Sequence, residues 1–347
     1  MKTLQKVVIS LTVLAVVVFA IHGVEPATGA DAASFYKGKK IIFIVPYKPG
    51  GGYDTYARMI APFLEKEMGA TVVVRNMPGG ETYVAFNHVY RGKPNGLTII
   101  IQDGKVATLN QLAKDPKAKG IDIVKFNWLC RITEDKSAIT MGVKSGYRTV
   151  EDMKKATKPI KFGATSKGSR GHIAASVLLE ILGAKGEIIM GFGGSPQLAL
   201  ATMRGELDGF GGSAASSLDF TQQPELFTFC VVAGQRAAVI PDVPTLGELV
   251  ALRPEQEKWV DRLDKIMGAD RVILTTPGVP TERVELLRNA LHKVLHDKEF
   301  LAIAKKSERP IDYLSGPEVQ SFAADLLKMP ESEAKQVIGV MLDKYLK

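Results

Sequence analysis

IIFIVPYKPGGGYDTYARMIAPFLEKEM, residues 41–68, is the stretch that decides the fold. It opens with five apolar residues, 41–45, which have the length and character of a buried strand. A turn at residues 46–52 follows and contains three consecutive glycines. Apolar residues, among them Tyr56, Ile60 and Leu64, then recur at helical spacing. A strand, a glycine turn and a helix in this order form the repeating unit of a parallel sheet covered by helices.

The same unit recurs along the rest of the chain, separated by glycine-rich turns. We expect further strands at residues 71–75, 97–102, 139–143, 160–164, 187–190, 206–210 and 271–275. We expect helices at residues 84–90, 149–156, 172–182, 196–204, 281–296 and 316–327, with residues 211–213 opening one more. The apolar run 227–233 is interpreted as the return of the chain to the first domain. The sequence therefore predicts two α/β lobes between which the chain crosses twice.

The first thirty residues have the pattern of a cleaved export signal. Lys2 and Lys6 precede an apolar run at residues 7–21, and small residues around Ala30 offer a cleavage site. A membrane span needs about 20 apolar residues, so an uncleaved anchor is the less favoured alternative. No cysteine follows the run, which argues against a lipid anchor. We expect residues 1–30 to be a signal peptide and the mature protein to be periplasmic.

Size and charge restrict the classes of function. Removal of the first 30 of 347 residues leaves 317, enough for two domains with a core in each. The formal net charge is +8 at pH 7, but the basic residues form no dense run, so nucleic acid is not the expected partner. A mildly positive field is compatible with an anionic ligand.

Four glycine-rich turns, each between a strand and a helix, are the candidate binding elements. They lie at residues 49–52, 78–80, 166–169 and 191–195. Glycine lets successive backbone N–H groups point at one place, and the following helix adds partial positive charge there. In open α/β sheets such turns lie at the carboxyl ends of strands, where ligands bind. Any single turn could serve tight packing alone. Four such turns together favour a site in which the two lobes hold an anion between them.

Motifs of the common enzyme classes are absent or incomplete. Residues 193–197, GGSPQ, lack the last glycine of the Gly-x-Ser-x-Gly nucleophile elbow. Residues 49–54 lack the Lys-Ser/Thr of a P-loop. Residues 209–214, GFGGSA, match the loose dinucleotide pattern, but no acidic residue closes a second strand about twenty residues later. We therefore expect no enzymatic activity, no cofactor and no bound metal.

Two side chains near these turns have both a structural and a binding interpretation. Asp54 follows the triple glycine, where a carboxylate caps a helix, and a pair with Arg58 is the favoured interpretation. His172 stands at the start of a helix, where it could line a cleft or serve packing alone. Both stay among the candidate ligand contacts.

Seven segments carry a family resemblance. The first are IVPYKPGGGYDTYARMIAPFL (44–64), VVVRNMPGG (72–80) and KPNGLTI (93–99). The others are GATSKGSRGHIAASVLLEILGAK (163–185), GFGGSPQLALATMRGELDG (191–209), PDVPTLGEL (241–249) and TTPGVPTERVELLRNALHKVLHDKEFLAIAKK (275–306). They occur in this order between residues 44 and 306, so the resemblance extends over nearly all of the mature chain. Together they resemble the extracytoplasmic receptors of tripartite tricarboxylate transporters (the Bug family).

The resemblance implies a fold and a function. The fold is the type II periplasmic-binding-protein fold, an α/β architecture of two Rossmann-like lobes with a two-strand hinge and a central cleft. Residues 34–132 and 228–347 would form the first lobe, and residues 133–227 the second. Members capture small carboxylates by lobe closure, mainly with backbone amides, and deliver them to the transporter's membrane components. We expect a monomer with this role; a ligand-sensing subunit of a sensor kinase is the alternative, and an exported hydrolase has no sequence support.

The resemblance also places candidate ligand contacts, position by position. In the first lobe they are Tyr47, Pro49, Gly50, Gly51, Gly52, Tyr53, Asp54, Gly79 and Gly80. In the second lobe they are Thr165, Ser166, Gly168, Ser169, His172, Gly193, Gly194, Ser195 and Ser213. Ser166 replaces a glycine of the family pattern, and residues 191–194 read GFGG where relatives often have Gly-Tyr-Pro-Gly or Pro-Tyr-x-Gly. Because both departures fall where the ligand should lie, the usual ligand preference is not transferred.

Two pairs of side chains lead to further expectations. Lys167 and Arg170 add charge at the second-lobe turn, which suits either a second ligand carboxylate or an exposed position. We expect a disulfide between Cys130 and Cys230, since an oxidising compartment permits one and both fall on strands expected to run side by side near the crossover. Two buried thiols acting as small apolar side chains are the alternative.

Overall fold

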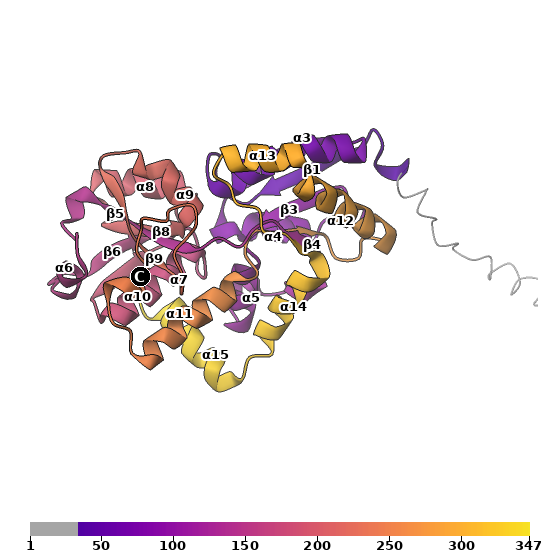
Figure 1. The fold of residues 1–347 in the computed structure, drawn as a ribbon. Coiled ribbons are helices and arrows are strands. Elements are labelled where there is room, and N and C mark those ends of the chain that lie inside the picture. Colours follow the sequence, from indigo (N-terminus) through magenta and orange to yellow (C-terminus); the bar gives the residue numbers. More distant parts are fainter. Residues whose placement is uncertain (1–33) are drawn as a thin grey trace, which may run out of the picture.

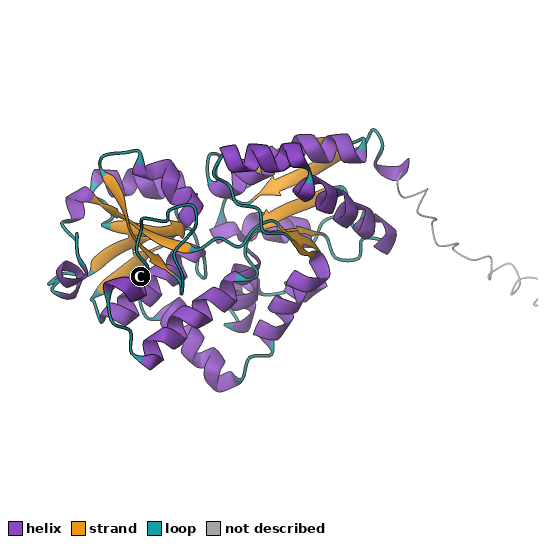
Figure 2. Ribbon diagram, in the orientation of Figure 1, coloured by secondary structure: helices purple, strands orange, loops and turns teal. Residues whose placement is uncertain are grey.

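The computed structural model describes residues 34–347, so the predicted signal peptide lies outside the described residues. Two lobes lie side by side, each built on one sheet covered by helices (Figures 1 and 2). Within the described part of the chain, no helix is both long and apolar enough to span a bilayer.

The first lobe contains a six-stranded sheet in the order β11-β4-β10-β3-β1-β2. Its strands are β1 (Lys40–Val45), β2 (Thr71–Asn76), β3 (Thr98–Gln102), β4 (Asn127–Arg131), β10 (Val272–Thr275) and β11 (Leu314–Ser315). β1 runs parallel to β2 and β3, whereas β10 is antiparallel to both β3 and β4. The parallel part is the β-α-β-α-β pattern that the sequence predicts.

Helices cover both faces of this sheet. They are α3 (Gly52–Met68), α4 (Tyr83–Tyr90), α5 (Gly104–Leu112), α12 (Thr281–His296), α13 (Lys298–Lys306) and α14 (Gly316–Leu327). Ile41 and Phe43 pack with α3, α12 and α13, while Ile44 packs on the opposite face with α4. Because both faces are buried, β1 is a continuous apolar run rather than an alternating one. α3 ends at Gly69, whose φ of 59° terminates the helix in the left-handed conformation.

The second lobe contains a five-stranded sheet in the order β7-β6-β8-β5-β9. Its strands are β5 (Ser137–Gly142), β6 (Ile160–Gly163), β7 (Gly186–Ile189), β8 (Gly209–Ser213) and β9 (Leu226–Val232). Its helices are α6 (Val150–Lys154), α7 (Arg170–Leu182), α8 (Ser195–Arg204), α9 (Ala214–Thr221), α10 (Leu246–Leu249), α11 (Pro254–Met267) and α15 (Glu331–Ile338), the last followed by the helical turn Gly339–Asp343.

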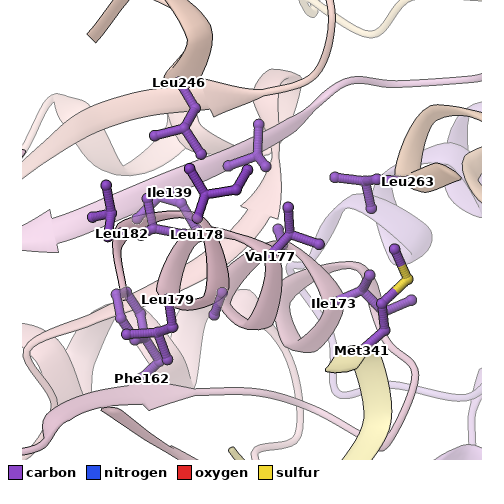
Figure 3. Packing of buried hydrophobic residues seen from close by; sticks show 14 of the residues in the cluster. Ile139, Phe162, Ile173, Val177, Leu178, Leu179, Leu182, Leu246, Leu263 and Met341 are labelled. Carbon is purple, nitrogen blue, oxygen red and sulfur yellow. The ribbon is translucent and has the colours of Figure 1, made fainter. Parts of the chain in front are cut away.

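Helix α7 forms the centre of the second lobe. All but one of its residues are buried, the exception being Glu180. Figure 3 shows Ile173 and Val177 beside Met341 and Leu263, which come from the C-terminal turn and from α11. A helix that is apolar on nearly every side is a core helix, so α11 and the C-terminal turn belong to this lobe.

The lobe boundary at residue 228 that the sequence predicts is wrong. β9 pairs with β5 from Leu226 opposite Gly142 to Val232 opposite Ser137, so the second sheet continues beyond that boundary. The chain returns to the first lobe only after α11, and after α14 it crosses again to pack α15 against the second lobe. The described chain therefore crosses between the lobes three times, not twice as the sequence predicts. The first two crossing segments are hydrogen-bonded to each other, with Ile132 N donating to Arg271 O at 2.9 Å.

The strand and turn predicted at residues 206–213 are also displaced. β8 spans Gly209–Ser213, and the next helix begins only at Ala214. A Cβ on Gly211 would come within 2.5 Å of the Gly171 carbonyl oxygen, so the glycines let β8 approach α7. Their function is close packing within the strand, not a turn.

The predicted disulfide is absent. Cys130 lies in β4 of the first sheet opposite Ile273, and Cys230 lies in β9 of the second sheet opposite Ile139. Both thiols are free and buried, and burial raises the pKa of each well above its usual value. The alternative of two small apolar side chains is the correct one.

Candidate functional site

A cavity of about 70 Å³ lies between the two lobes. The first lobe and hinge contribute Tyr47, Gly51, Gly52, Tyr53, Asp103 and Arg271. The second lobe contributes Thr165, Ser169, Arg170, Gly171, Gly194, Ser195, Leu198, Gly211, Gly212, Ser213 and Ser216. The cavity therefore occupies the cleft that the two-lobed fold predicts.

Five helices begin at this cavity. The residues that precede α3, α5, α7, α8 and α9 all line it, and they are Gly51, Asp103, Ser169, Gly194 and Ser213. Of these five, only Ser213 caps its helix with its side chain, accepting from Ser216 N at 3.1 Å. The first N–H groups of a helix have no partner within it, and the helix dipole makes that end partly positive. Five such ends around one cavity make a site for an anion.

The arrangement depends on glycines that let backbone segments approach each other. A Cβ on Gly52 would lie 2.8 Å from Ser216 Oγ and 3.0 Å from an Arg271 guanidinium nitrogen. A Cβ on Gly171 would lie 2.3 Å from the Gly211 carbonyl oxygen. Side chains at these positions would push α3 and α7 away from the residues that complete the cavity.

A buried chain of charges runs beneath the cavity. Lys105 Nζ lies 2.5 Å from Asp103 Oδ2 and 2.8 Å from Asp270 Oδ1, and Arg170 pairs with the other oxygen of Asp270. Burial opposes ionisation of Asp270, but Arg170 and Lys105 outweigh it and hold its pKa well below the usual range. Burial raises the pKa of Asp103, against the opposing effect of Lys105. The two cations and two carboxylates balance each other.

A second balanced pair lies at the hinge. Arg271 lies 3.2 Å from the Asp135 carboxylate and donates to Ser213 Oγ at 2.9 Å. Its guanidinium carbon also lies 5.4 Å from the centre of the Tyr53 ring and 4.9 Å from that of Tyr56. Arg271 has a φ of 39°, an uncommon conformation for a residue with a side chain. These partners hold it in place at the floor of the cleft.

Two residues that line the cavity each have a buried oxygen without a hydrogen-bond partner among the described residues. These oxygens are Asp103 Oδ1 in the first lobe and Ser169 Oγ in the second. Nearby, Tyr53 donates its hydroxyl to Asp270 at 3.2 Å. Burial, with Asp103 and Asp270 close by, raises the pKa of Tyr53 well above its usual value, so its hydroxyl stays protonated. The cavity thus offers a carboxylate acceptor on one side and a hydroxyl on the other.

Hydrogen bonds across the mouth of the cleft hold the lobes together. Lys48 N donates to Gly193 O at 2.8 Å, and Lys167 N donates to Glu81 Oε2 at 2.9 Å. A Cβ added at Gly50 or Gly51 would come into van der Waals contact with Pro196, at 3.8 or 3.9 Å. The structure is therefore of the closed form.

Half of the sequence-predicted contacts line the cavity. These are Tyr47, Gly51, Gly52, Tyr53, Thr165, Ser169, Gly194, Ser195 and Ser213. Gly79, Gly80 and Gly193 line a neighbouring hollow at the mouth, together with Glu81. Pro49, Gly50, Asp54, Ser166, Gly168 and His172 are not part of the cavity lining.

Asp54 and His172 have structural partners. Asp54 accepts from Gly50 N at 3.0 Å and from Arg58 Nε at 2.9 Å, which is the structural pair favoured from the sequence. His172 Nδ1 accepts from Gly168 N at 2.9 Å and so closes the turn before α7. Burial, assisted by Lys167, lowers the pKa of His172 to about 3, so this ring is neutral at physiological pH.

Other lining residues were not identified from the sequence. Asp103 directly follows the predicted strand 97–102, so its position at a strand's carboxyl end was an available signal. Arg271 had no such signal, because it precedes a strand and reaches the cavity from the hinge. Arg170 is buried in the lining and paired, whereas Lys167 pairs with Asp343 at 2.8 Å.

Residues 34–347 contain no group of three or more histidines, cysteines or carboxylates suited to a metal ion.

Comparisons with known proteins agree with this geometry. A profile of the family described as "Tripartite tricarboxylate transporter family receptor" matches residues 56–326. The "UPF0065 protein in the TAR-I ttuE-ttuC' intergenic region" of Agrobacterium vitis is 26% identical over 223 residues, 63% of this chain and 64% of that protein. The chain thus matches just under two thirds of that relative's length.

Two solved structures superpose on nearly their full length. The periplasmic binding protein BugD has a TM-score of 0.73 and 20% identity, covering 88% of this chain and 99% of its own. MatC from Rhodopseudomonas palustris with bound malate has a TM-score of 0.70 and 19% identity, covering 86% and 99%. The predicted two-lobed periplasmic-binding-protein fold is confirmed.

Proposed function

The chain belongs to the tripartite tricarboxylate transporter receptor family, and from this premise we propose that it captures a small organic carboxylate in the periplasm by lobe closure and delivers it to the membrane components of such a transporter. The observation that carries the proposal is the convergence of five helix N-termini on one cavity between the lobes. The family is one of solute-binding receptors and not of enzymes.

The balance of buried charges supports an anionic ligand. Lys105, Arg170 and Arg271 are matched by Asp103, Asp135 and Asp270, so the side chains leave little net charge at the cavity. The remaining field comes from the helix ends, which favour a negative group at their N–H donors. A carboxylate can accept several such bonds at once. The malate bound to MatC is a carboxylate of this kind.

Contacts between the lobes support capture by closure. Residues of both lobes line the cavity, and Lys48 and Lys167 donate backbone hydrogen bonds across its mouth. A ligand held by both lobes binds the closed form better than the open form and so shifts the equilibrium towards closure. The closed molecule, acting as a monomer, then presents one joint surface to the transporter.

The test of ligand class is thermal unfolding of the mature protein with a panel of mono-, di- and tricarboxylic acids. A ligand at 100 times its Kd stabilises the folded state by about 2.7 kcal/mol, which raises the Tm by several degrees. The neutral amide of each acid is the matched control, and it should produce no shift. Equal shifts with acid and amide, or no shift with any acid after removal of co-purified ligand, would contradict the proposal.

The test of the partner is capture of membrane components by the ligand-loaded protein. Recovery of transporter subunits supports delivery, whereas recovery of a sensor kinase alone would replace the transport role with a signalling one. Export is tested by the N-terminal sequence of the protein recovered from the periplasm, which should begin after residue 30.

A further inference from the structure

Asp103 is the one cavity-lining carboxylate with a free oxygen in the described part of the chain. The residue is 2% exposed and directly precedes α5, yet its side chain makes no capping bond to that helix. Lys105 holds Oδ2 at 2.5 Å, and Oδ1 is left without a partner. Asp270, the other carboxylate on Lys105, is instead saturated by Lys105, Arg170 and Tyr53. Of these two carboxylates, only that of Asp103 therefore has an oxygen free to accept a hydrogen bond from a ligand.

A ligand whose only polar groups are carboxylates does not suit the space beside Asp103 Oδ1. A ligand anion in a closed cavity would lie close to the Asp103 oxygen, and two unpaired carboxylate oxygens repel each other strongly where water is excluded. A hydrogen-bond donor on the ligand removes the conflict, because it pairs with Oδ1 and separates the two negative groups. A buried acceptor left unpaired on closure penalises every ligand that lacks such a donor.

The opposite lobe offers complementary chemistry. Ser169 lines the cavity at the N-terminus of α7, a helix of 13 residues, and its buried Oγ has no partner. A hydroxyl and free N–H groups at a helix start suit a carboxylate. The cavity thus has an acceptor in one lobe and an anion-binding helix end in the other, so a ligand with both groups bridges the lobes as they close.

We propose that the ligand is a carboxylate that also bears a hydroxyl or ammonium group, and that Asp103 selects it by accepting a hydrogen bond from that group. This inference rests on the proposed function and adds to it the class of carboxylate. A site built to pair with a ligand donor rejects the analogue without it far more strongly than a site that differs only in size.

The test is calorimetric titration of the full mature protein with acids that share a skeleton. The first set is succinate, malate and aspartate, the second is glutarate, 2-hydroxyglutarate and glutamate, and the third is phenylacetate and mandelate. Within at least one set we expect a substituted acid to bind about tenfold more tightly, or better, than the unsubstituted acid. Equal affinity of substituted and unsubstituted acids in every set that binds would overturn the inference and leave the proposed function intact.

Three variants locate the selectivity. In the Asp103→Asn variant the affinities of the substituted and the unsubstituted acid should differ by no more than about threefold, because the amide does not carry the charge that attracts the ligand's donor group. Ser169→Ala should weaken all acids of a set alike, since the hydroxyl faces their shared carboxylate. Asp325→Asn, the same chemical change on an exposed part of α14, should alter neither.

Each remaining outcome is decisive. A preference that persists unchanged in a folded Asp103→Asn protein shows that another residue selects the ligand and overturns the assignment. If that variant does not fold, as judged by circular dichroism, the comparison of acids with the unaltered protein still decides the ligand class. Failure of every acid in the panel to bind refutes the proposed function itself, and the inference falls with it.

Discussion

Gly52→Ala is the substitution that most directly tests lobe closure. Gly52 is the first residue of α3 in the first lobe, and a Cβ there would lie 2.8 Å from Ser216 Oγ of the second lobe and 3.0 Å from Arg271. Arg271 has little freedom to withdraw, because it is held by Asp135 and Ser213. The added methyl group therefore clashes in the closed form, and opening of the cleft relieves the contact with Ser216.

The expected loss of affinity follows from the cost of overpacking. Forcing one extra methyl group into a packed interior costs about 1–3 kcal/mol. Since every 1.4 kcal/mol is a factor of ten, the Kd should increase by about 5- to 150-fold if the whole cost falls on the closed form. Gly52 is the first residue of α3, where the preference of helix interiors for alanine does not apply, and opening of the cleft relieves the contact with Ser216 Oγ, so the Tm without ligand should change little.

The assay is titration calorimetry with the acid that gives the largest thermal shift, together with the Tm of each ligand-free variant. Gly339→Ala is the matched control, because its φ of −57° accommodates alanine, nothing lies within 4 Å of a Cβ there, and it is not part of the cavity lining. Unchanged affinity in Gly52→Ala, or an equal loss in both variants, would refute the closure argument.

Three further predictions concern stability, closure and the thiols. Because burial lowers the pKa of His172 from 6.5 to about 3, the neutral ring contributes stability that is complete above pH 6.5 and is lost as the pH falls towards 3. Urea unfolding at pH 7, 5 and 4 should show the free energy of unfolding falling by up to about 1.4 kcal/mol per pH unit. The His172→Gln variant should show a smaller fall, and equal pH dependence in the two proteins would contradict the assignment. Glu81→Gln weakens the contact with Lys167 N across the cleft mouth, so ligand dissociation should accelerate by about fivefold with little change in association, as measured by stopped flow. Cys130 and Cys230 should react with a thiol reagent only after denaturation, and a reducing agent should leave the Tm unchanged. The absence of both thiols from the denatured, unreduced protein would show a disulfide after all.

Local signals in the sequence predicted most of the elements. Helices at residues 281–296 and 316–327 have the bounds expected from proline, glycine and acidic residues at their starts. β1, predicted at residues 41–45, was also placed within one residue of its observed ends. These signals are local, since periodicity and turn chemistry depend on neighbours in the chain. Helix α5 was missed because it is short and buried and has no amphipathic pattern.

About half of the contact residues that were predicted from the glycine turns do line the cavity. The sequence marks where a chain can turn sharply into a helix, and in an α/β lobe those places lie on one edge of the sheet. It does not show which turns face the other lobe. Gly79 and Gly80 therefore line the mouth, whereas Gly51 and Gly194 line the cavity itself.

By itself the sequence determined the α/β class, the order of most strands and helices, and the family to which the chain belongs. Only the tertiary structure decided the return of the C-terminus to the second lobe and the charge chain beneath the cavity. Lys105 meets Asp270 across 165 positions of sequence, and Arg170 meets it across 100. No local pattern encodes such pairs, because their members are far apart in the sequence and meet only in the folded molecule. The free oxygen of Asp103 belongs to this second category, since its partners and its exposure are properties of the closed cleft.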